Sequence, residues 1–285
     1  MSFLSTSAAG ILTPEEVHAL VVQPTQEQSV AMQTATVVPT SSSEFRFPVV
    51  TDDAGTAWYL EGEDITLTDP TVDELVARPK KIASLTKVSR ELAEDSSPEA
   101  TALVGESVAR DMAKKIDAAW FAASTPKGPA GLASLIGTAG AVVGGSYANA
   151  DAFAEAISLI EQTGGTPTCF VSSASTVLAL SKLKKATGSN EPLLSPNLAT
   201  GATQRIERQL LGVRLWTTPD AMLDDDVVWA YDRSKVFVVV RRDTDLRIDE
   251  SFFFGSDSIA VRCTMRVDFA FPHAASVVNI GPDGS

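Results

Sequence analysis

The sequence has few of the residues from which enzyme active sites are usually built. Its 285 residues include only two histidines, His18 and His273, and two cysteines, Cys169 and Cys263. Two histidines leave little material for a Ser-His-Asp triad or a histidine-rich metal site. G-x-S-x-G, a phosphate-binding loop ending in Gly-Lys-Ser/Thr, and G-x-G-x-x-G are absent as well. We therefore expect no catalytic residue, no metal site and no cofactor, although missing motifs alone do not exclude an enzyme.

Disulfides, long apolar runs and positive charge are also scarce. The two cysteines are isolated in apolar, strand-like surroundings, which argues against a disulfide framework and fits a reducing compartment. No run approaches the roughly 20 apolar residues of a membrane helix, and the N-terminus lacks the pattern of a signal peptide. The net charge of -13 argues against a surface that binds nucleic acid through clustered Lys and Arg. A soluble protein with no membrane partner is expected.

The strongest helix signal covers residues 96–123. Ser96 can cap the helix with Glu99 three residues later, and Pro98 falls in the first turn, where proline is tolerated. Apolar residues recur every fourth position, at Val104, Val108, Met112, Ile116 and Trp120. Such a helix would be about 39 Å long.

The strongest strand signal covers residues 258–271. Odd positions from Ile259 to Phe271 are apolar, whereas the even positions include Ser258, Arg262 and Arg266. A strand of this length spans about 45 Å, well beyond a typical strand. A long helix lying on a strand of similar length predicts an elongated plate and not a sphere.

Residues 1–44 have the composition of an arm. A short helix can start at Thr13, but after Pro24 the segment is rich in Gln, Thr, Ser and Val and offers little for a core. Such a segment is either disordered or ordered by lying across a neighbour.

An acidic segment follows in residues 45–80. Residues 52–55 have turn chemistry, and apolar and polar residues alternate around Trp58 and Ile65, which predicts paired strands. No Lys or Arg lies between Arg46 and Arg78, whereas eight carboxylates do: Asp52, Asp53, Glu61, Glu63, Asp64, Asp69, Asp73 and Glu74. So many uncompensated charges cannot be buried. The segment must project into solvent or meet a basic partner.

Helix and strand patterns alternate between about 150 and 240. Helices are predicted at 151–163, from the cap Ser173 onward and at 205–211, with strands at 168–171, 212–216, 227–231 and 236–240 and another within 243–251. This alternation predicts a compact α/β or α+β subdomain.

The order of these features resembles that of the tailed-phage major capsid proteins, which share the Hong Kong 97 capsid fold. The resemblance covers roughly residues 13–280, and no single motif carries it. The matching residues are Trp58-Tyr59-Leu60-Glu61-Gly62, Leu85, Ser89-Arg90-Glu91-Leu92, Asp95, Gly131-Leu132, Leu211-Gly212-Val213, Ala230-Tyr231-Asp232, Arg241, Phe254, Arg262, Arg266-Val267-Asp268 and Pro272.

The resemblance implies an α+β phage major-capsid fold with four parts. These are an N-terminal arm (1–44), an extended β-hairpin loop over the adjacent subunit (45–80), a peripheral domain (81–139 and 241–285) with a spine helix (96–123) and long β-strands, and an axial domain (140–240). It implies self-assembly as pentamers and hexamers into the icosahedral or prolate shell around a phage double-stranded DNA genome. Two alternatives stay open: an encapsulin-type nanocompartment that packages a cargo enzyme, and a soluble enzyme of unknown class.

The resemblance also implies where subunits meet and which partners they have. We expect the acidic loop to dock on basic residues of a neighbour, and because residues 50–78 of the loop contain no lysine we expect no covalent cross-linking. Scaffolding, portal and possibly decoration proteins would be separate chains, DNA would be enclosed without sequence-specific binding, and assembly would take place in the bacterial host cytoplasm. The candidate interface residues are Asp52, Asp53, Trp58, Glu61, Glu63 and Asp64 on the loop and Arg78, Lys80, Lys81, Arg110 and Lys114 on its receiving surface.

Overall fold

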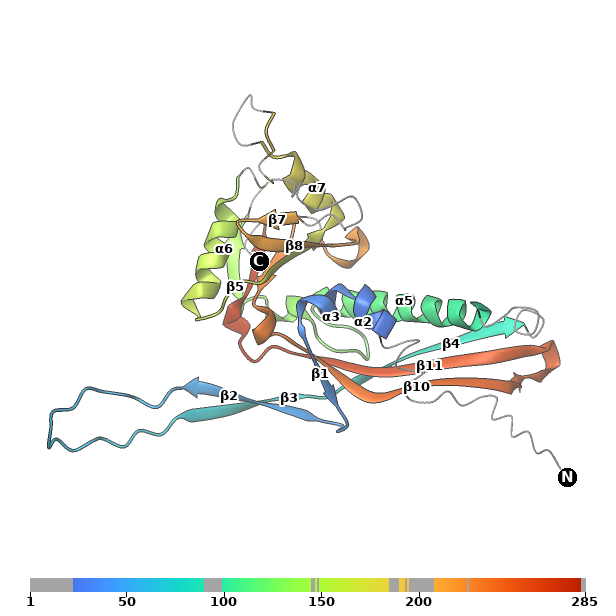
Figure 1. The fold of residues 1–285 in the computed structure, drawn as a ribbon, viewed down its shortest axis with the longest axis horizontal. Coiled ribbons are helices and arrows are strands. Elements are labelled where there is room, and N and C mark those ends of the chain that lie inside the picture. The colour runs from blue at the N-terminus through green and yellow to red at the C-terminus, as the bar shows by residue number, and fades with distance from the viewer. Residues whose placement is uncertain are drawn as a thin grey trace.

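The computed structural model describes residues 23–89, 99–144, 147, 149–184, 190–192, 194, 208–224 and 226–282. It has an elongated lower part, from which a hairpin projects, and an upper part that stands above one end of it (Figure 1). The helices are α2 (Gln23–Gln28), α3 (Val30–Thr34), α5 (Glu99–Phe121), α6 (Asp151–Gln162) and α7 (Ala174–Lys182). The strands are β1 (Thr36–Thr40), β2 (Phe45–Asp52), β3 (Thr71–Ala77), β4 (Lys80–Ser89), β5 (Gly140–Val143), β6 (Cys169–Ser173), β7 (Arg208–Leu210), β8 (Val213–Thr218), β9 (Val228–Tyr231), β10 (Phe237–Phe253), β11 (Ser258–Ala270) and β12 (Val277–Gly281).

The lower part is a four-stranded sheet with α5 lying along one face. Its strand order is β1-β10-β11-β4, with β1 parallel to β10 and the other pairs antiparallel. The long C-terminal strand was predicted within one residue of its end, as β11. From Cys263 to Phe269 the odd residues are buried and the even ones are not. This alternation gives the sheet an apolar face for the helix and a polar face away from it.

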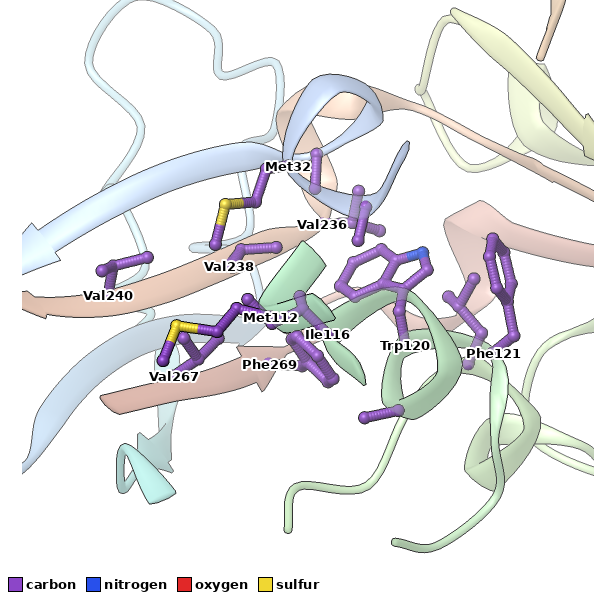
Figure 2. Packing of buried hydrophobic residues seen from close by; sticks show 14 of the residues in the cluster. Met32, Met112, Ile116, Trp120, Phe121, Val236, Val238, Val240, Val267 and Phe269 are labelled. Carbon is purple, nitrogen blue, oxygen red and sulfur yellow. The ribbon is translucent and has the colours of Figure 1, made fainter. Parts of the chain in front are cut away.

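Helix α5 confirms the helix expected at 96–123, although Ser96 and its cap lie outside the described residues. Val108, Met112, Ile116 and Trp120 are buried. Trp120 packs edge-on against Phe269 of β11, with ring centroids 4.9 Å apart. Figure 2 shows Met112, Ile116, Trp120 and Phe269 meeting in one cluster between helix and sheet. The four-residue apolar repeat therefore fixes which side of the helix faces the sheet.

The upper part is a six-stranded sheet with the order β5-β12-β9-β6-β8-β7. A second apolar core lies between this sheet and its helices, and it includes Phe153 and Ile160 of α6 and Leu180 of α7. Ser173 caps α7 as predicted, because its side chain accepts a hydrogen bond from the Thr176 amide. The expected boundary at residue 140 coincides with the start of β5, whereas the boundary at 240 and the placement of the C-terminal segment do not follow the sheets. Strand β10 of the four-stranded sheet already begins at Phe237. Strand β12, near the C-terminus, belongs to the six-stranded sheet.

Two local predictions in the second half of the chain are wrong. A helix was expected at 205–211, yet Arg208–Leu210 is strand β7, paired with β8. Separate strands were expected at 236–240 and 243–251, but the structure has the single strand β10. Its register against β11 shifts between Arg241 and Asp245 and again between Asp249 and Phe253. Such bulges interrupt the alternation of side chains without ending the strand, so the sequence pattern breaks where the structure continues.

The segment that follows Pro24 corrects the picture of an arm with little core of its own. Ala31, Met32 and Ala35 are buried in the cluster under α5, and β1 adds a parallel edge strand to β10. The helix expected from Thr13 lies outside the described residues. The described residues from 23 to 40 are thus ordered by packing on their own subunit.

Candidate inter-subunit interface

The acidic segment forms a hairpin that stands away from every other element (Figure 1). β2 and β3 pair from Phe45↔Ala77 to Val50↔Val72, with a register shift before Asp52↔Thr71. The turn expected at residues 52–55 is wrong: β2 runs through Asp52, and the chain turns at Glu61–Gly62, where Gly62 has a positive φ of 88°. Glycine suits such a turn because it has no Cβ to clash. The expected projection into solvent is confirmed.

The outer part of the hairpin, residues 53–70, keeps cross-strand contacts without regular strand structure. The Glu63 amide donates to the Leu60 carbonyl over 3.1 Å, and the Thr68 hydroxyl donates to the Gly55 carbonyl over 2.9 Å. In both contacts the two residue numbers add up to 123, as they do in the strand pair Asp52↔Thr71, so all three belong to the same register. The two sides of the tip therefore keep one register. The paired strands expected around Trp58 and Ile65 are nevertheless not formed, because residues 53–70 have no regular strand structure.

The loop candidates are exposed wherever the structure describes their side chains. Trp58 is fully exposed, and Asp53, Glu61, Glu63 and Asp64 are exposed beside it. Asp52 ends strand β2. Nearer the base of the hairpin the charge is compensated within the chain, because Arg46 donates to both carboxylate oxygens of Glu74 at 3.1 Å. The uncompensated negative charge is concentrated at the tip.

The five basic candidates do not form one surface. Arg78 pairs with Glu44 over 2.9 Å, and its backbone amide donates to the Asp268 carboxylate, so it helps to hold the hairpin base in place. Arg110 and Lys114 are exposed on α5 but outside the groove described next. Lys80 and Lys81 remain, at the start of the edge strand β4.

Lys80 and Lys81 line a groove of about 350 Å³ between β4, α5 and the loop that follows α5. Met112, Ile116 and Phe269 form part of its apolar lining. Two further lysines, Lys115 of α5 and Lys127 of the loop, border the same groove, together with one carboxylate, Asp111.

Sequence reasoning missed the two additional lysines of this groove. No local pattern joins either of them to β4, because the contact is made by the packing of α5 on the sheet. Within the described part of the chain, Lys81, Lys115 and Lys127 have no ion-pair partner. The groove therefore combines an apolar floor with uncompensated positive charge.

The described residues offer no other chemistry of note. They contain no group of three or more His, Cys, Asp and Glu side chains placed to hold a metal ion. Among the helices described, none is long and apolar enough to cross a membrane.

A model of the phage capsid family matches residues 9–280. The chain belongs to the phage capsid family. The match spans the hairpin, both sheets and α5, and among curated proteins no sequence matches the chain.

Solved structures agree on the fold. A structure from Mycobacterium phage Adephagia has a TM-score of 0.70 at 17% identity, covering 90% of this chain and 91% of that one. A structure from Microbacterium phage Oxtober96 has a TM-score of 0.69 at 20% identity, with the same coverage. The capsid of a native GTA particle has a TM-score of 0.66 at 20% identity, covering 87% of this chain and 89% of that one.

These matches confirm the α+β phage major-capsid fold and the major-capsid role expected from the resemblance. The protein is a structural protein, a major capsid protein that associates with itself to form the shell of the virion. The encapsulin alternative is not favoured.

Proposed function

We propose that this capsid protein assembles as pentamers and hexamers into a closed shell around a double-stranded DNA genome. The observation that carries the proposal is the projecting hairpin, whose tip is acidic, partly apolar and, among the described residues, without contact to the rest of its own subunit. An isolated two-stranded hairpin is at best marginally stable in water, so such a tip gains its stability from a partner. In a shell made of one protein, the neighbouring copy supplies that partner.

The two sheets suggest how a subunit is divided within the shell. The four-stranded sheet with the spine helix α5 and the long strands β10 and β11 forms the peripheral domain in our proposal. The six-stranded sheet with α6 and α7 forms the axial domain at the centres of pentamers and hexamers. This assignment moves β12 from the expected peripheral segment to the axial domain, because β12 pairs with β5 and β9.

Loop docking on a neighbour is the contact that we propose to hold adjacent subunits together. The tip carries Asp53, Glu61, Glu63 and Asp64, and Lys80 and Lys81 belong to a surface with net positive charge. Opposite charges at the rim of an interface speed association and select its orientation. The absence of lysine from residues 50–78 supports non-covalent assembly. We further propose that the protein has no catalytic role and assembles in the host cytoplasm with separate scaffolding and portal proteins.

Electron microscopy tests the proposed function directly. Protein expressed alone, or together with its neighbouring genes, should form closed shells or rings of five and six subunits in negative stain. Native particles should contain DNA that resists nuclease, whereas a nanocompartment would contain a cargo enzyme. A subunit that stays monomeric under all these conditions would contradict the proposal.

A further inference from the structure

The tip of the hairpin has one apolar face. The register that joins Gly55 to Thr68 and Leu60 to Glu63 places Trp58 opposite Ile65. Directly opposed residues of an antiparallel pair lie on the same face, and so do residues two positions apart. In this register Trp58, Leu60, Ile65 and Leu67 share one face with Glu63, which is opposite Leu60, and all four apolar side chains are exposed.

None of the described elements of its own subunit covers this apolar face. The hairpin runs away from both sheets, and no other element lies near its tip (Figure 1). The extended chain between Ala77 and Gly62 spans about 50 Å. Its partner must therefore come from outside the subunit.

We propose that Trp58 inserts into the lysine-bordered groove between β4 and α5 of a second copy of this chain, and that the acidic residues around it pair with the groove lysines. The inference rests on the proposed function and names the surface on which the loop docks. The groove volume of about 350 Å³ lies in the range of sites that hold a compact ligand group, and its floor is apolar. Tryptophan is the residue most often found as a buried anchor of such contacts.

Charge selects this groove over a second hollow of the described surface. Glu61, Glu63 and Asp64 adjoin Trp58 at the tip, and the groove has four lysines against one aspartate. The lysine ammonium groups can also contact the indole face. The two ends of the contact are therefore complementary in polarity as well as in charge.

The other hollow lies on the opposite side of the four-stranded sheet. It has a volume of about 380 Å³ and is lined by Leu85, Phe252, Arg247, Arg262, Asp249 and Ala260. Its two arginines are already compensated, since Asp245 lies 2.7 Å from Arg247 and 3.6 Å from Arg262. An acidic loop gains less there than at the groove, where three lysines have no ion-pair partner among the described residues.

Site-specific photo-crosslinking tests the placement without weakening the interface by a charge change. A photoreactive phenylalanine analogue replaces Trp58 in the full chain, the chains are assembled with isotopically labelled wild-type subunits, and the irradiated shells are digested for mass spectrometry. We expect crosslinks from position 58 to residues 80–84, 111–119 or 125–129 of another copy. Crosslinks to residues 247–262, crosslinks within one copy, or none in closed shells would overturn the inference.

Charge variants give a second readout. Lys81→Glu and Lys115→Glu should each raise the subunit concentration needed for assembly, and Trp58→Ala should raise it at least about tenfold. Glu63→Lys should partly restore assembly of Lys115→Glu. Lys87→Glu is the matched control, since Lys87 is an exposed lysine of the same strand that does not line the groove. The variant sites are exposed, and circular dichroism of the unassembled subunits confirms that each one folds.

The outcomes separate this inference from the proposed function. If the wild-type chain forms no shells, the proposed function fails. If shells form but Lys81→Glu and Lys115→Glu assemble like the wild type, only the groove assignment fails. Variants that assemble normally but retain less DNA would show that the lysines bind nucleic acid, and that result would also overturn the inference.

Discussion

At the scale of single residues, a buried carboxylate attaches the N-terminal segment to the spine helix. Asp117 of α5 is 4% exposed and accepts three hydrogen bonds, from the Ser29 hydroxyl at 2.6 Å and from the Val30 and Ala31 amides at 3.0 Å each. These donors lie at the N-terminus of α3, where helix amides have no partner within the helix. Asp117, which lies on α5, thus accepts the hydrogen bonds of amides at the start of α3 that a capping residue near that helix usually accepts.

Removal of this carboxylate should destabilise the subunit. Asp117→Ala leaves the Val30 and Ala31 amides and the Ser29 hydroxyl without their acceptor in a buried site, which costs at least about 2 kcal/mol. Urea denaturation of the unassembled subunit measures the loss. Asp111→Ala, an exposed carboxylate on the same helix, is the control and should change stability by less than about 0.5 kcal/mol. Equal effects of the two variants would contradict the role of Asp117.

The same residue should make stability depend on pH. Burial raises the pKa of Asp117 above its ordinary value of 3.8, although its three donors oppose the rise. The folded state therefore holds the proton more readily than the unfolded state, and the stabilisation is complete below the unfolded pKa and lost as pH rises through the folded pKa. The advantage of wild type over Asp117→Asn should shrink with rising pH, as urea titrations from acidic to neutral pH would measure. An advantage that grows with pH would refute this sign.

The two cysteines should be unreactive in the folded protein. Both are buried, and burial raises the pKa of Cys169 to about 12 and that of Cys263 to about 11, so neither forms the reactive thiolate near neutral pH. Titration with a thiol reagent should find no accessible thiol in the native subunit and two in denaturant. Rapid modification of either thiol in the native subunit would show that the cores open readily.

At the scale of elements, Gly131 decides how closely the chain passes the end of α5. A Cβ at this position would lie 2.2 Å from the carbonyl oxygens of Ala119 and Trp120, and the Gly131 amide donates to the Ala122 carbonyl over 3.0 Å. Gly131-Leu132 is one of the motifs that resemble the capsid family, and steric crowding explains why its first residue is glycine. Leu132 follows the close approach and is fully buried against the cluster that contains Trp120.

Gly131→Ala should accordingly loosen the end of the spine helix. The added methyl group meets rigid backbone, so we expect a loss of at least about 2 kcal/mol in the free energy of unfolding. Gly255→Ala is the matched control, because a Cβ there meets nothing within 4 Å. Thermal denaturation of both variants gives the comparison, and a wild-type melting temperature for Gly131→Ala would contradict the steric argument.

At the scale of the whole molecule, folding and assembly use different parts of the chain. The two cores under α5 and around α6 contain none of the tip residues 53–70. The subunit should therefore fold without the tip, and the shell should not form without it. Because of this separation, changes in the hairpin tip should alter assembly without altering the fold of the subunit.

Replacing residues 53–70 by a two-residue turn that joins Asp52 to Thr71 tests this separation. The unassembled variant should melt within a few degrees of wild type, because the removed residues make no contact with either core. In negative stain it should form no closed shells. Normal shells would show that the loop tip is dispensable for assembly and would weaken the proposed docking contact.

Salt should affect assembly in the same direction as loss of the acidic loop. Contacts between exposed charges are screened over about 8–10 Å at moderate ionic strength, whereas the apolar cores of the subunit are not. We expect higher salt to raise the subunit concentration needed for shells while the melting temperature of the subunit changes little. Light scattering over a salt series measures the first quantity, and shells that form equally well at every salt concentration would exclude an electrostatic contribution.

The sequence alone determined the features that depend on neighbours along the chain. The period of four in α5 and the period of two in β11 predicted both long elements, because one face of each must be buried. The run of acids between Arg46 and Arg78 predicted a projecting loop, because uncompensated charge cannot enter a core. Together with their order, these features were sufficient to recognise the family.

Tertiary structure decided what depends on residues far apart in the chain. The packing of α5 on β4 brings Lys115 and Lys127 to Lys80 and Lys81, and the same packing places Asp117 under Ser29. Pairing with β8 makes Arg208–Leu210 a strand, and bulges carry β10 through a break in its pattern. The groove and the Asp117 contact join residues tens of positions apart, and the β10 bulges are backbone irregularities, so neither leaves a period in the local sequence. Strand β7 pairs with the neighbouring strand β8 in the chain, and its three residues are too few to show a period.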